Sequence, residues 1–265
     1  MSTPDEMGLT AEAAQGYERL FVPAIFRRWS PVLLEAAGVE PGHDLLDAGC
    51  GTGAIARDAV KVVGDHGSVA GIDKSASMLR VARDLCPTAA FRQGDVAELP
   101  YTDGSFDVVV SSFMLMFVPD PVQAIREMRR VLRPGGRLAV SVWEGLPNNP
   151  VYRVLVDATR DVVDDAAADT MAWPFALGDP DRLHGIFDAA GVPNVSLRAR
   201  EGGADFSSAE EFVYAEVRAW LLADRVNADQ MAELASRVRA RCAGFVDGEG
   251  IVRFPLNALL ATFNA

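Results

Sequence analysis

Three glycines stand at alternate positions in the stretch LLDAGCGTG, residues 45–53, directly after an apolar run and an aspartate. Glycines lack Cβ atoms, so a turn built from them can pass close to a ligand, and a helix expected from Ala54 would offer free N–H groups there. A dinucleotide site has a similar turn, but its spacing is GxGxxG, whereas this one is GxGxG. The carboxylate of Asp47 would repel a pyrophosphate and attract an ammonium or sulfonium group. The pattern therefore predicts a cationic or zwitterionic ligand without phosphate.

Two further aspartates follow the next two expected strands. Asp73, in VAGIDKS, ends the second strand, where a carboxylate can accept hydrogen bonds from two ribose hydroxyls. Asp95, in FRQGDVAELP, follows the third strand, where it could accept from an exocyclic adenine amine while Val96 offers a backbone N–H to a ring nitrogen. Nicotinamide-binding folds share the second acid but not usually the third. Three acids at the carboxyl ends of successive strands indicate an adenosine-bearing ligand.

The elements that must position these residues follow from the hydrophobic pattern. Short β-rich runs alternate with helical patterns, which indicates βαβ units and a parallel sheet. Strands are expected at Asp44–Ala48, Ser68–Ile72, Ala89–Gln93, Phe106–Ser111 and Arg137–Val142. Apolar residues at helical spacing predict helices at Ala54–Val63, Ser75–Leu85 and Pro121–Leu132.

The rest of the chain gives weaker patterns. Two late β-patterned runs, Val195–Phe206 and Ile251–Phe263, are expected to pair antiparallel at the sheet edge, with helices over 208–243 between them. Residues 10–37 predict two helices around Pro23, and the stretch 146–180, rich in Pro, Asn and Asp, is expected to be irregular.

Composition excludes several classes of protein. The formal net charge of -12 argues against DNA, RNA or an anionic membrane as a partner. The three cysteines lack CxxC spacing, so neither a disulfide framework nor a metal site is expected. The N-terminus has neither the basic start nor the apolar core of a signal peptide, and no apolar run approaches the roughly 20 residues of a membrane helix. A cytoplasmic protein is expected, and a homodimer is compatible with the sequence.

Taken as an ordered set, these stretches resemble the class I S-adenosylmethionine-dependent methyltransferases. LLDAGCGTG is similar to the first motif of that family, GIDKS to its second acidic loop, GDVAELPYTDGSFDVVVSSFMLMFVPD to its adenine and fourth-strand segments, and EMRRVLRPGGRLAVSVW to its fifth-strand entry. The resemblance covers roughly residues 41–144. Within the family, the sequence is most similar to the small-molecule enzymes of quinone and natural-product biosynthesis.

The resemblance implies an α/β fold with a Rossmann-like, seven-stranded, mostly parallel sheet, helices on both faces and an antiparallel last strand. It implies a single methyltransferase domain over residues 1–265, with N-terminal and inserted helical caps. The divisions expected are a helical lid at 1–40, a cofactor-binding core at 41–145, substrate-cap insertions at 146–180 and 207–245, and the final strand at 250–264.

S-adenosyl-L-methionine is the cofactor that the resemblance implies, and its methionine end should lie against the first motif. Three glycines are expected to line that end: Gly49, Gly51 and Gly53. Asp47 should hold the ammonium group directly or through water. Ser111 and Ser112 should present backbone carbonyls and hydroxyls to the same group, and Tyr17 resembles a lid residue that closes over the cofactor.

The adenosine end should lie against the second and third acidic loops. Asp73 is expected to bind the ribose, with Lys74 and Met78 beside the adenosine. Asp95 and Val96 are expected to recognise the adenine edge.

The implied reaction is methyl transfer to the oxygen, carbon or nitrogen of a small, partly apolar molecule. The sulfonium methyl is already activated, and alignment alone can account for roughly 7–11 kcal/mol of the barrier, so a base is optional. No catalytic residue is assigned, because His43, His66 and His184 have no visible partner and fit surface or packing roles. Cys50, between the motif glycines, is expected only as a small side chain that fits there.

Aromatic residues flank the motifs and fit either a cap over an apolar substrate or an ordinary hydrophobic seam: Phe21, Phe26, Trp29, Trp173 and Phe175. Trp143 and Glu144 fit a pocket wall or plain core equally well. Two other functions stay open. One is a protein that binds the cofactor without transferring the methyl group, as a regulator or partner subunit. The other is an NAD-dependent oxidoreductase, which conflicts with GxGxG and Asp95.

Overall fold

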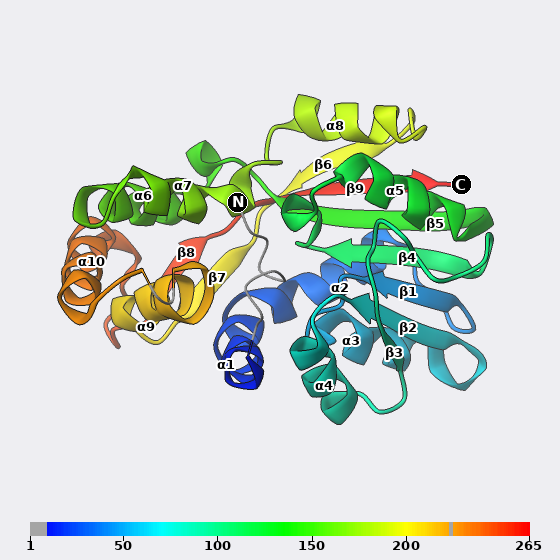
Figure 1. Ribbon diagram of the computed structural model, residues 1–265, viewed down its shortest axis with the longest axis horizontal. Helices are drawn as coiled ribbons and strands as arrows, with labels where there is room; N and C mark the ends of the chain where they lie inside the picture. The colour runs from blue at the N-terminus through cyan, green and yellow to red at the C-terminus, as the bar shows by residue number, and fades with distance from the viewer. Residues whose placement is uncertain (1–9, 223–224) are drawn as a thin grey trace.

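The structure of the chain, a computed structural model, describes residues 10–222 and 225–265. Seven strands form the main sheet in the order β3-β2-β1-β4-β5-β9-β6 (Figure 1). The first five strands run parallel to one another: β1 (Asp44–Ala48), β2 (Ser68–Asp73), β3 (Ala90–Gln93), β4 (Phe106–Ser112) and β5 (Leu132–Trp143). Strand β9 (Ala258–Asn264) runs antiparallel to both β5 and β6 (Ser196–Arg200). The predicted fold class, with its antiparallel last strand, is confirmed.

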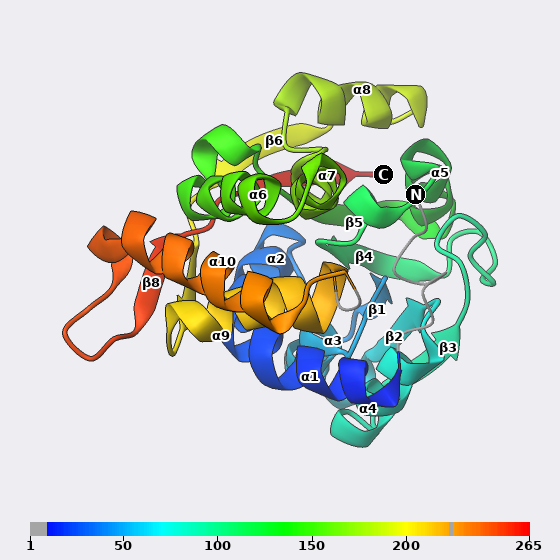
Figure 2. The same ribbon diagram turned by 60° about the vertical axis from the view of Figure 1, so that its left-hand side comes forward.

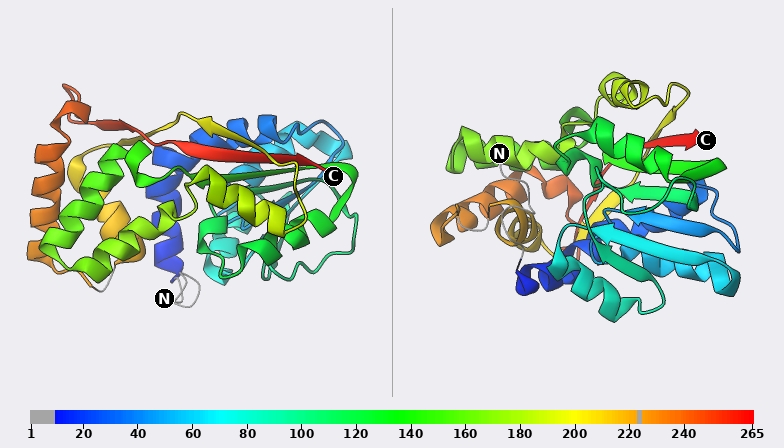
Figure 3. Two further views of the ribbon diagram at one scale, coloured as in Figure 1. Left: turned by 90° about the horizontal axis from the view of Figure 1, so that it is seen from above. Right: turned by 45° about the vertical axis from the view of Figure 1, so that its right-hand side comes forward.

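Helices cover both faces of this sheet (Figure 3). Helices α2 (Arg27–Ala36) and α3 (Ala54–Val63) share one apolar layer with the sheet, while α5 (Pro121–Arg130) and α8 (Pro180–Ala189) pack on the other face. Helix α4 (Ala76–Leu85) packs against β2 and β3. In α3 the buried side chains are Ile55, Ala56, Ala59 and Val63. That spacing of three to four residues is the helical stripe that the sequence predicted.

The two late β-patterned runs each divide into two strands. The first run gives β6 and β7 (Gly203–Phe206), and the second gives β8 (Val252–Pro255) and β9. β7 and β8 pair in a separate two-stranded sheet, which carries the chain away from the edge of the main sheet (Figure 1). The bend lies at Gly202, where a Cβ atom would stand only 2.2 Å from the indole ring of Trp29. A glycine lets the ribbon turn against that indole.

The prediction of an irregular stretch at 146–180 is wrong. This stretch contains α6 (Pro150–Val162) and α7 (Asp165–Ala172) before α8. Pro150 stands in the first turn of α6, where a missing N–H costs no hydrogen bond. Asp164 caps α7 by accepting a hydrogen bond from the N–H of Ala167 at 2.7 Å. The same residue types that suggested a loop therefore begin helices here.

The remaining predicted cap, residues 207–245, holds α9 (Ala209–Val213), the π-helix η6 (Tyr214–Leu221) and α10 (Ala228–Arg241). Figure 2 shows α9 and α10 beside α6 and α7, and α6 contacts both α7 and α10. Residues 223 and 224 of this cap lie outside the described residues. Among the described residues no helix is both long and apolar enough to cross a membrane.

The two helices predicted around Pro23 are both present, and a π-helical turn joins them into one nearly continuous segment. Helix α1 (Ala11–Phe21) leads through a π-helical turn, η1 (Val22–Phe26), into α2. The N–H of Arg27 donates to the carbonyl of Val22, five residues earlier, so the wider turn accommodates the proline. The first residues of the predicted lid, 1–9, lie outside the described residues.

Candidate functional site

Three adjoining cavities lie at the carboxyl ends of the central parallel strands, and Gly49 lines all of them. The large cavity, of about 150 Å³, extends from the glycine loop to the caps. The Asp95 cavity, of about 60 Å³, lies beside the loop after β3. The Asp47 cavity, of about 40 Å³, lies against the start of α3. Asp73 lines the first two, and Tyr17 and Ser112 line the first and third. The fold thus brings together residues from separate motifs.

The glycine loop has the open backbone that its sequence predicted. Gly49, Gly51 and Gly53 all have positive φ, at 79°, 52° and 78°. At Gly49 a Cβ atom would stand 2.3 Å from the side chain of Met114, so no larger residue fits without movement. Gly53 begins α3 and lines none of the three cavities, so its predicted contact with the cofactor stays a prediction.

Asp47 is a fully buried carboxylate at the carboxyl end of β1. Among the described residues, neither of its oxygens has a hydrogen-bond partner of good geometry. Burial raises its pKa to about 7, with the charge of Asp73 adding to the shift and the N–H of Ala56 opposing it. A buried, unpaired carboxylate that lines a cavity favours a cationic ligand, so Asp47 fits the ammonium group of the predicted cofactor.

Asp73 holds two loops in place from the end of β2. Its Oδ2 accepts a hydrogen bond from the N–H of Gly51 at 2.8 Å, and its Oδ1 accepts from the N–H of Ser75 at 2.9 Å. Each carboxylate oxygen can accept a second hydrogen bond, so Asp73 can bind ribose hydroxyls while it holds the glycine loop. Met78, on the first turn of α4, lines the large cavity nearby.

Asp95 and Val96 line the Asp95 cavity together with Lys74. The Oδ1 of Asp95 accepts a hydrogen bond from the N–H of Ala97 at 2.8 Å, and its Oδ2 lies 3.0 Å from the ammonium group of Lys74. Both charged side chains are more than a third exposed, so this ion pair contributes little energy by itself. It does hold the carboxylate at the cavity wall.

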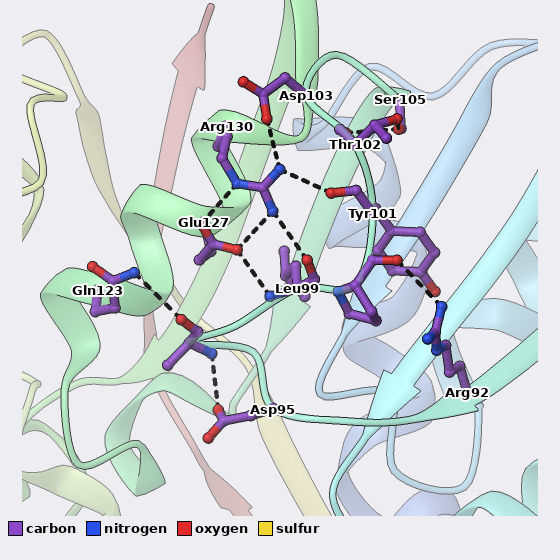
Figure 4. Close-up of polar contacts among 12 residues, drawn as sticks. Arg92, Asp95, Leu99, Tyr101, Thr102, Asp103, Ser105, Gln123, Glu127 and Arg130 are labelled. Carbon is purple, nitrogen blue, oxygen red and sulfur yellow. Dashed lines mark hydrogen bonds and ion pairs between the residues drawn. The ribbon is translucent and has the colours of Figure 1, made fainter.

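The chain that follows Asp95 is fixed to α5 by hydrogen bonds (Figure 4). The N–H of Leu99 donates to Glu127 Oε2 at 2.9 Å, and Arg130 donates to the carbonyls of Leu99 and Tyr101 at 3.0 and 2.8 Å. Arg130 also pairs with Glu127 at 2.7 Å and lowers the pKa of that carboxyl. These contacts of Glu127 and Arg130 fix the chain that follows the wall of the Asp95 cavity to the folded core.

The two serines that end β4 point to different places in the structure. Ser112 lines both the large and the Asp47 cavity, whereas Ser111 is fully buried and lines none of the three. Successive side chains of a strand point to opposite faces, so only one of the two hydroxyls can reach the site. The predicted side-chain role of Ser111 is therefore not supported, and a role for its backbone carbonyl stays a prediction.

The predicted lid lines the site through Tyr17, and an ion pair joins it to α3. Tyr17 lines the large and Asp47 cavities, and burial, together with the nearby acids, raises the pKa of its hydroxyl. The next residue, Glu18, pairs with Arg57 of α3 at 2.9 Å, and the same guanidinium donates to the carbonyl of Thr52 at 2.9 Å. Arg57 thus links α1 to the loop that follows β1.

An aromatic wall closes one side of the large cavity. The rings of Phe113 and Trp143 stack at 3.6 Å between centroids and 15° between planes, and Phe26 lies against both at 5.9 and 6.2 Å. Phe113 has φ 50°, the one positive value found for a non-glycine residue in the described part of the chain. Such a backbone conformation is strained, and strained residues often cluster at functional sites. Of the pair that ends β5, Trp143 is a cavity wall and Glu144 lines none of the three cavities.

Sequence reasoning missed three polar residues of the large cavity: Ser75 before α4, Tyr152 on α6 and Glu216 on η6. The hydroxyl of Tyr152 donates to Glu216 Oε1 at 2.5 Å. A signal was present, because Glu216 shares its helical spacing with the buried Phe212, Val213 and Val217. A lone glutamate on an apolar stripe is unusual, since such a residue is rarely fully buried without a partner.

The remaining candidates for a nucleophile or a base are the three histidines, which lie outside the three cavities, and Cys50, whose thiol is protonated. None of the three histidines lines these cavities. Cys50 lines the Asp47 cavity, but burial raises the pKa of its thiol well above the ordinary value, so the thiol stays protonated. Among residues 10–222 and 225–265, no group of three or more His, Cys, Asp or Glu side chains is arranged to hold a metal ion.

Comparison with known proteins agrees with this geometry. Residues 46–140 match the family described as a methyltransferase domain. The ubiquinone/menaquinone biosynthesis C-methyltransferase UbiE of Cellvibrio japonicus is 35% identical over 196 residues, which are 68% of this chain and 78% of that protein. The demethylmenaquinone methyltransferase of Staphylococcus carnosus is 32% identical over 189 residues, 66% of this chain and 78% of that protein. Phosphoethanolamine N-methyltransferase 2 of Haemonchus contortus, solved with S-adenosyl-L-methionine, shares the fold with a TM-score of 0.62 at 17% identity, over 98% of this chain and 58% of that one.

Proposed function

The chain belongs to the class I S-adenosylmethionine-dependent methyltransferases, and we propose that its methyl acceptor is a small, partly apolar molecule with a flat ring. The observation that carries this proposal is the aromatic wall of the large cavity, where Phe113 and Trp143 stack and which Gly49 and Asp73 also line. A cavity with flat apolar sides and a few polar groups favours a ring-shaped ligand. The names of the two relatives, which act in quinone biosynthesis or on demethylmenaquinone, also support a ring-bearing acceptor.

When bound, S-adenosyl-L-methionine supplies a methyl group on a positively charged sulfur, which is already activated for displacement. We propose that Asp47 binds its ammonium group, Asp73 the ribose, and Asp95 and Val96 the adenine edge. Tyr17 and the lid then exclude water from the large cavity, and the aromatic wall aligns the acceptor. Transfer to oxygen, carbon or nitrogen is compatible with these roles, and the relatives favour carbon.

Calorimetric titration with S-adenosylmethionine, S-adenosylhomocysteine and NADH tests the cofactor residues. We expect the two adenosyl ligands to bind, NADH not to bind, and Asp73→Asn to weaken binding of the adenosyl ligands. Asp73→Ala should weaken it further, because it also removes the acceptor for the N–H of Gly51. Asp84→Asn, at an exposed aspartate of α4, is the matched control. Binding of NADH with no binding of S-adenosylmethionine would contradict the proposed site.

A panel of acceptors tests the proposed substrate. Release of S-adenosylhomocysteine is measured with hydroquinones, naphthoquinols and phenols, and in parallel with polar amino alcohols. We expect turnover with the ring compounds. Turnover with the polar compounds alone would show that the acceptor class is wrong, and turnover with any acceptor would exclude a protein that binds the cofactor without transfer. The cytoplasmic location and the homodimer remain predictions, which fractionation and size-exclusion chromatography would check.

A further inference from the structure

Glu216 and Tyr152 form a buried polar pair within the otherwise apolar part of the large cavity. The two residues are 64 positions apart in the chain and come from the two separate caps. Their side chains are joined at 2.5 Å, and both residues line the cavity that Gly49 and Asp73 also line. The walls of this cavity therefore present a carboxyl group and a phenol to a molecule that lies beside the bound cofactor.

The geometry of Tyr152 makes it a fixed donor. Its ring packs against Phe175, Phe212 and Phe254 with centroid distances of 5.0, 5.4 and 5.9 Å. Burial and the charge of Glu216 raise the pKa of its hydroxyl well above the ordinary value. Tyr152 thus keeps its proton and directs it at Glu216 Oε1, so it positions the carboxylate and does not act as a base.

Glu216 is the group in this part of the cavity that can take up a proton near neutral pH. Burial raises its pKa to about 7, and the hydrogen bond from Tyr152 opposes the rise. Among the side chains that the structure describes, the titratable groups that face it are Tyr152 from α6 and Tyr17 from α1, and both stay protonated. Among the described residues Tyr152 is the donor found for this carboxyl group, so Oε2 is left for a ligand.

Glu216 also lies on a π-helical turn. The segment η6 packs against α1 of the lid and against α7 of the first cap. The π-helical form is rare, and it is often found at functional sites. A buried pair that served packing alone would need no access to a cavity, yet Glu216 and Tyr152 both line one.

We propose that Glu216, positioned by Tyr152, accepts the proton of a hydroxyl group on the ring of the methyl acceptor, which makes that acceptor a phenol or quinol. This inference rests on the proposed function. For transfer to oxygen, the acceptor O–H bond breaks and its proton passes to the carboxylate of Glu216. The oxygen forms a bond to the methyl carbon while the bond from that carbon to sulfur breaks, with both electrons left on sulfur. For transfer to a ring carbon, loss of the same proton to Glu216 makes the neighbouring ring carbon nucleophilic. That carbon bonds to the methyl carbon as the bond to sulfur breaks, with both electrons left on sulfur. The ring carbon then loses its own proton to water while the ring oxygen takes its proton back from Glu216.

Ionisation of bound 4-nitrophenol tests this contact without turnover. The protein is saturated with S-adenosylhomocysteine, and the yellow phenolate is followed as the pH is raised in wild type, Glu216→Gln and Glu233→Gln. A carboxylate beside the hydroxyl opposes its ionisation, whereas an amide does not. We expect the bound phenol to ionise at least one pH unit lower in Glu216→Gln. Glu233, an exposed residue of α10 paired with Arg237, is the matched control and should behave like wild type.

A second readout uses S-adenosylhomocysteine formation with 1,4-naphthohydroquinone. We expect kcat to fall about 10²-fold or more in Glu216→Gln, with unchanged binding of S-adenosylmethionine. In Tyr152→Phe the carboxylate loses its donor, so the pH of half-maximal kcat/KM should move upward. This variant tests the idea even if Glu216→Gln fails to fold, since an unmoved profile would contradict the positioning role.

The outcomes separate the two proposals. An unchanged ionisation of bound 4-nitrophenol in Glu216→Gln, with less than a threefold loss of turnover, would overturn the role of Glu216. Failure of 4-nitrophenol to bind wild type would overturn the hydroxyl-bearing acceptor. Binding of the cofactor without turnover of any acceptor would instead contradict the proposed function, while the shift in ionisation would still decide whether Glu216 faces the hydroxyl.

Discussion

Two buried carboxylates, Asp47 and Glu216, lie on the same group of cavities and differ in their partners. Burial raises the pKa of each to about 7. Asp47 accepts no hydrogen bond of good geometry from the described residues and lies near a second acid, Asp73, whereas Glu216 accepts one from Tyr152. The same shift in pKa thus accompanies two different environments. An unpaired carboxylate beside another acid is stabilised by a cation, and a carboxylate with one donor can gain and lose a proton.

The largest expected difference between the two carboxylates is in their effect on the affinity for the cofactor. Asp47→Asn should weaken the binding of S-adenosylmethionine about 100-fold, because it removes the negative charge proposed to pair with the ammonium group. Glu216→Gln should change the same affinity less than threefold, because that side chain is proposed to contact the acceptor. Isothermal titration calorimetry measures both. Equal losses in the two variants would contradict the division of roles.

The second effect concerns stability against pH without ligand. Each carboxyl binds its proton more tightly in the folded than in the unfolded chain, so the free energy of unfolding falls as the pH rises from about 4 to 7. Between pH 5 and pH 8 each group should lower the free energy of unfolding by about 2 kcal/mol. In the amide variant of either residue, the contribution of that residue to the decrease should be absent. Urea unfolding at the two pH values measures this.

Saturating S-adenosylmethionine then distinguishes the two groups. The bound ammonium should abolish the contribution of Asp47 to the pH dependence, and that of Glu216 should remain. If the ligand abolished neither contribution, the proposed pairing of Asp47 would be wrong.

The smallest effect concerns the connection between the lid and the Asp47 cavity. Arg57→Ala should weaken the binding of S-adenosylmethionine about fivefold, or about 1 kcal/mol, because it breaks the partly buried pair with Glu18 and the hydrogen bond to Thr52. Lys61→Ala, which breaks an exposed pair with Asp58 on the same helix, is the control and should leave affinity unchanged. Equal affinities in Arg57→Ala and Lys61→Ala would show that the lid does not depend on this contact.

Much of the fold could be predicted where local patterns are strong. The five parallel strands and three connecting helices agree with their expected ranges within a few residues, except that β5 begins at Leu132 rather than Arg137. The pattern failed over 146–180, because the Pro and Asp residues at helix starts are also typical of loops. It also missed the bend at Gly202, because alternation continues through a change of pairing partner.

The sequence by itself predicted the surroundings of the glycine loop, because a strand, a glycine turn and a helix start place Asp47 and Gly49 through local geometry, and Asp73 ends the next strand. Tertiary structure alone decided that Asp47 lacks a well-oriented hydrogen-bond donor within residues 10–222 and 225–265, that Ser111 is turned away, and that Phe113 stacks on Trp143. It also decided that Tyr152 meets Glu216. Such contacts depend on how distant helices pack, and neither helical nor strand periodicity encodes which buried faces will meet.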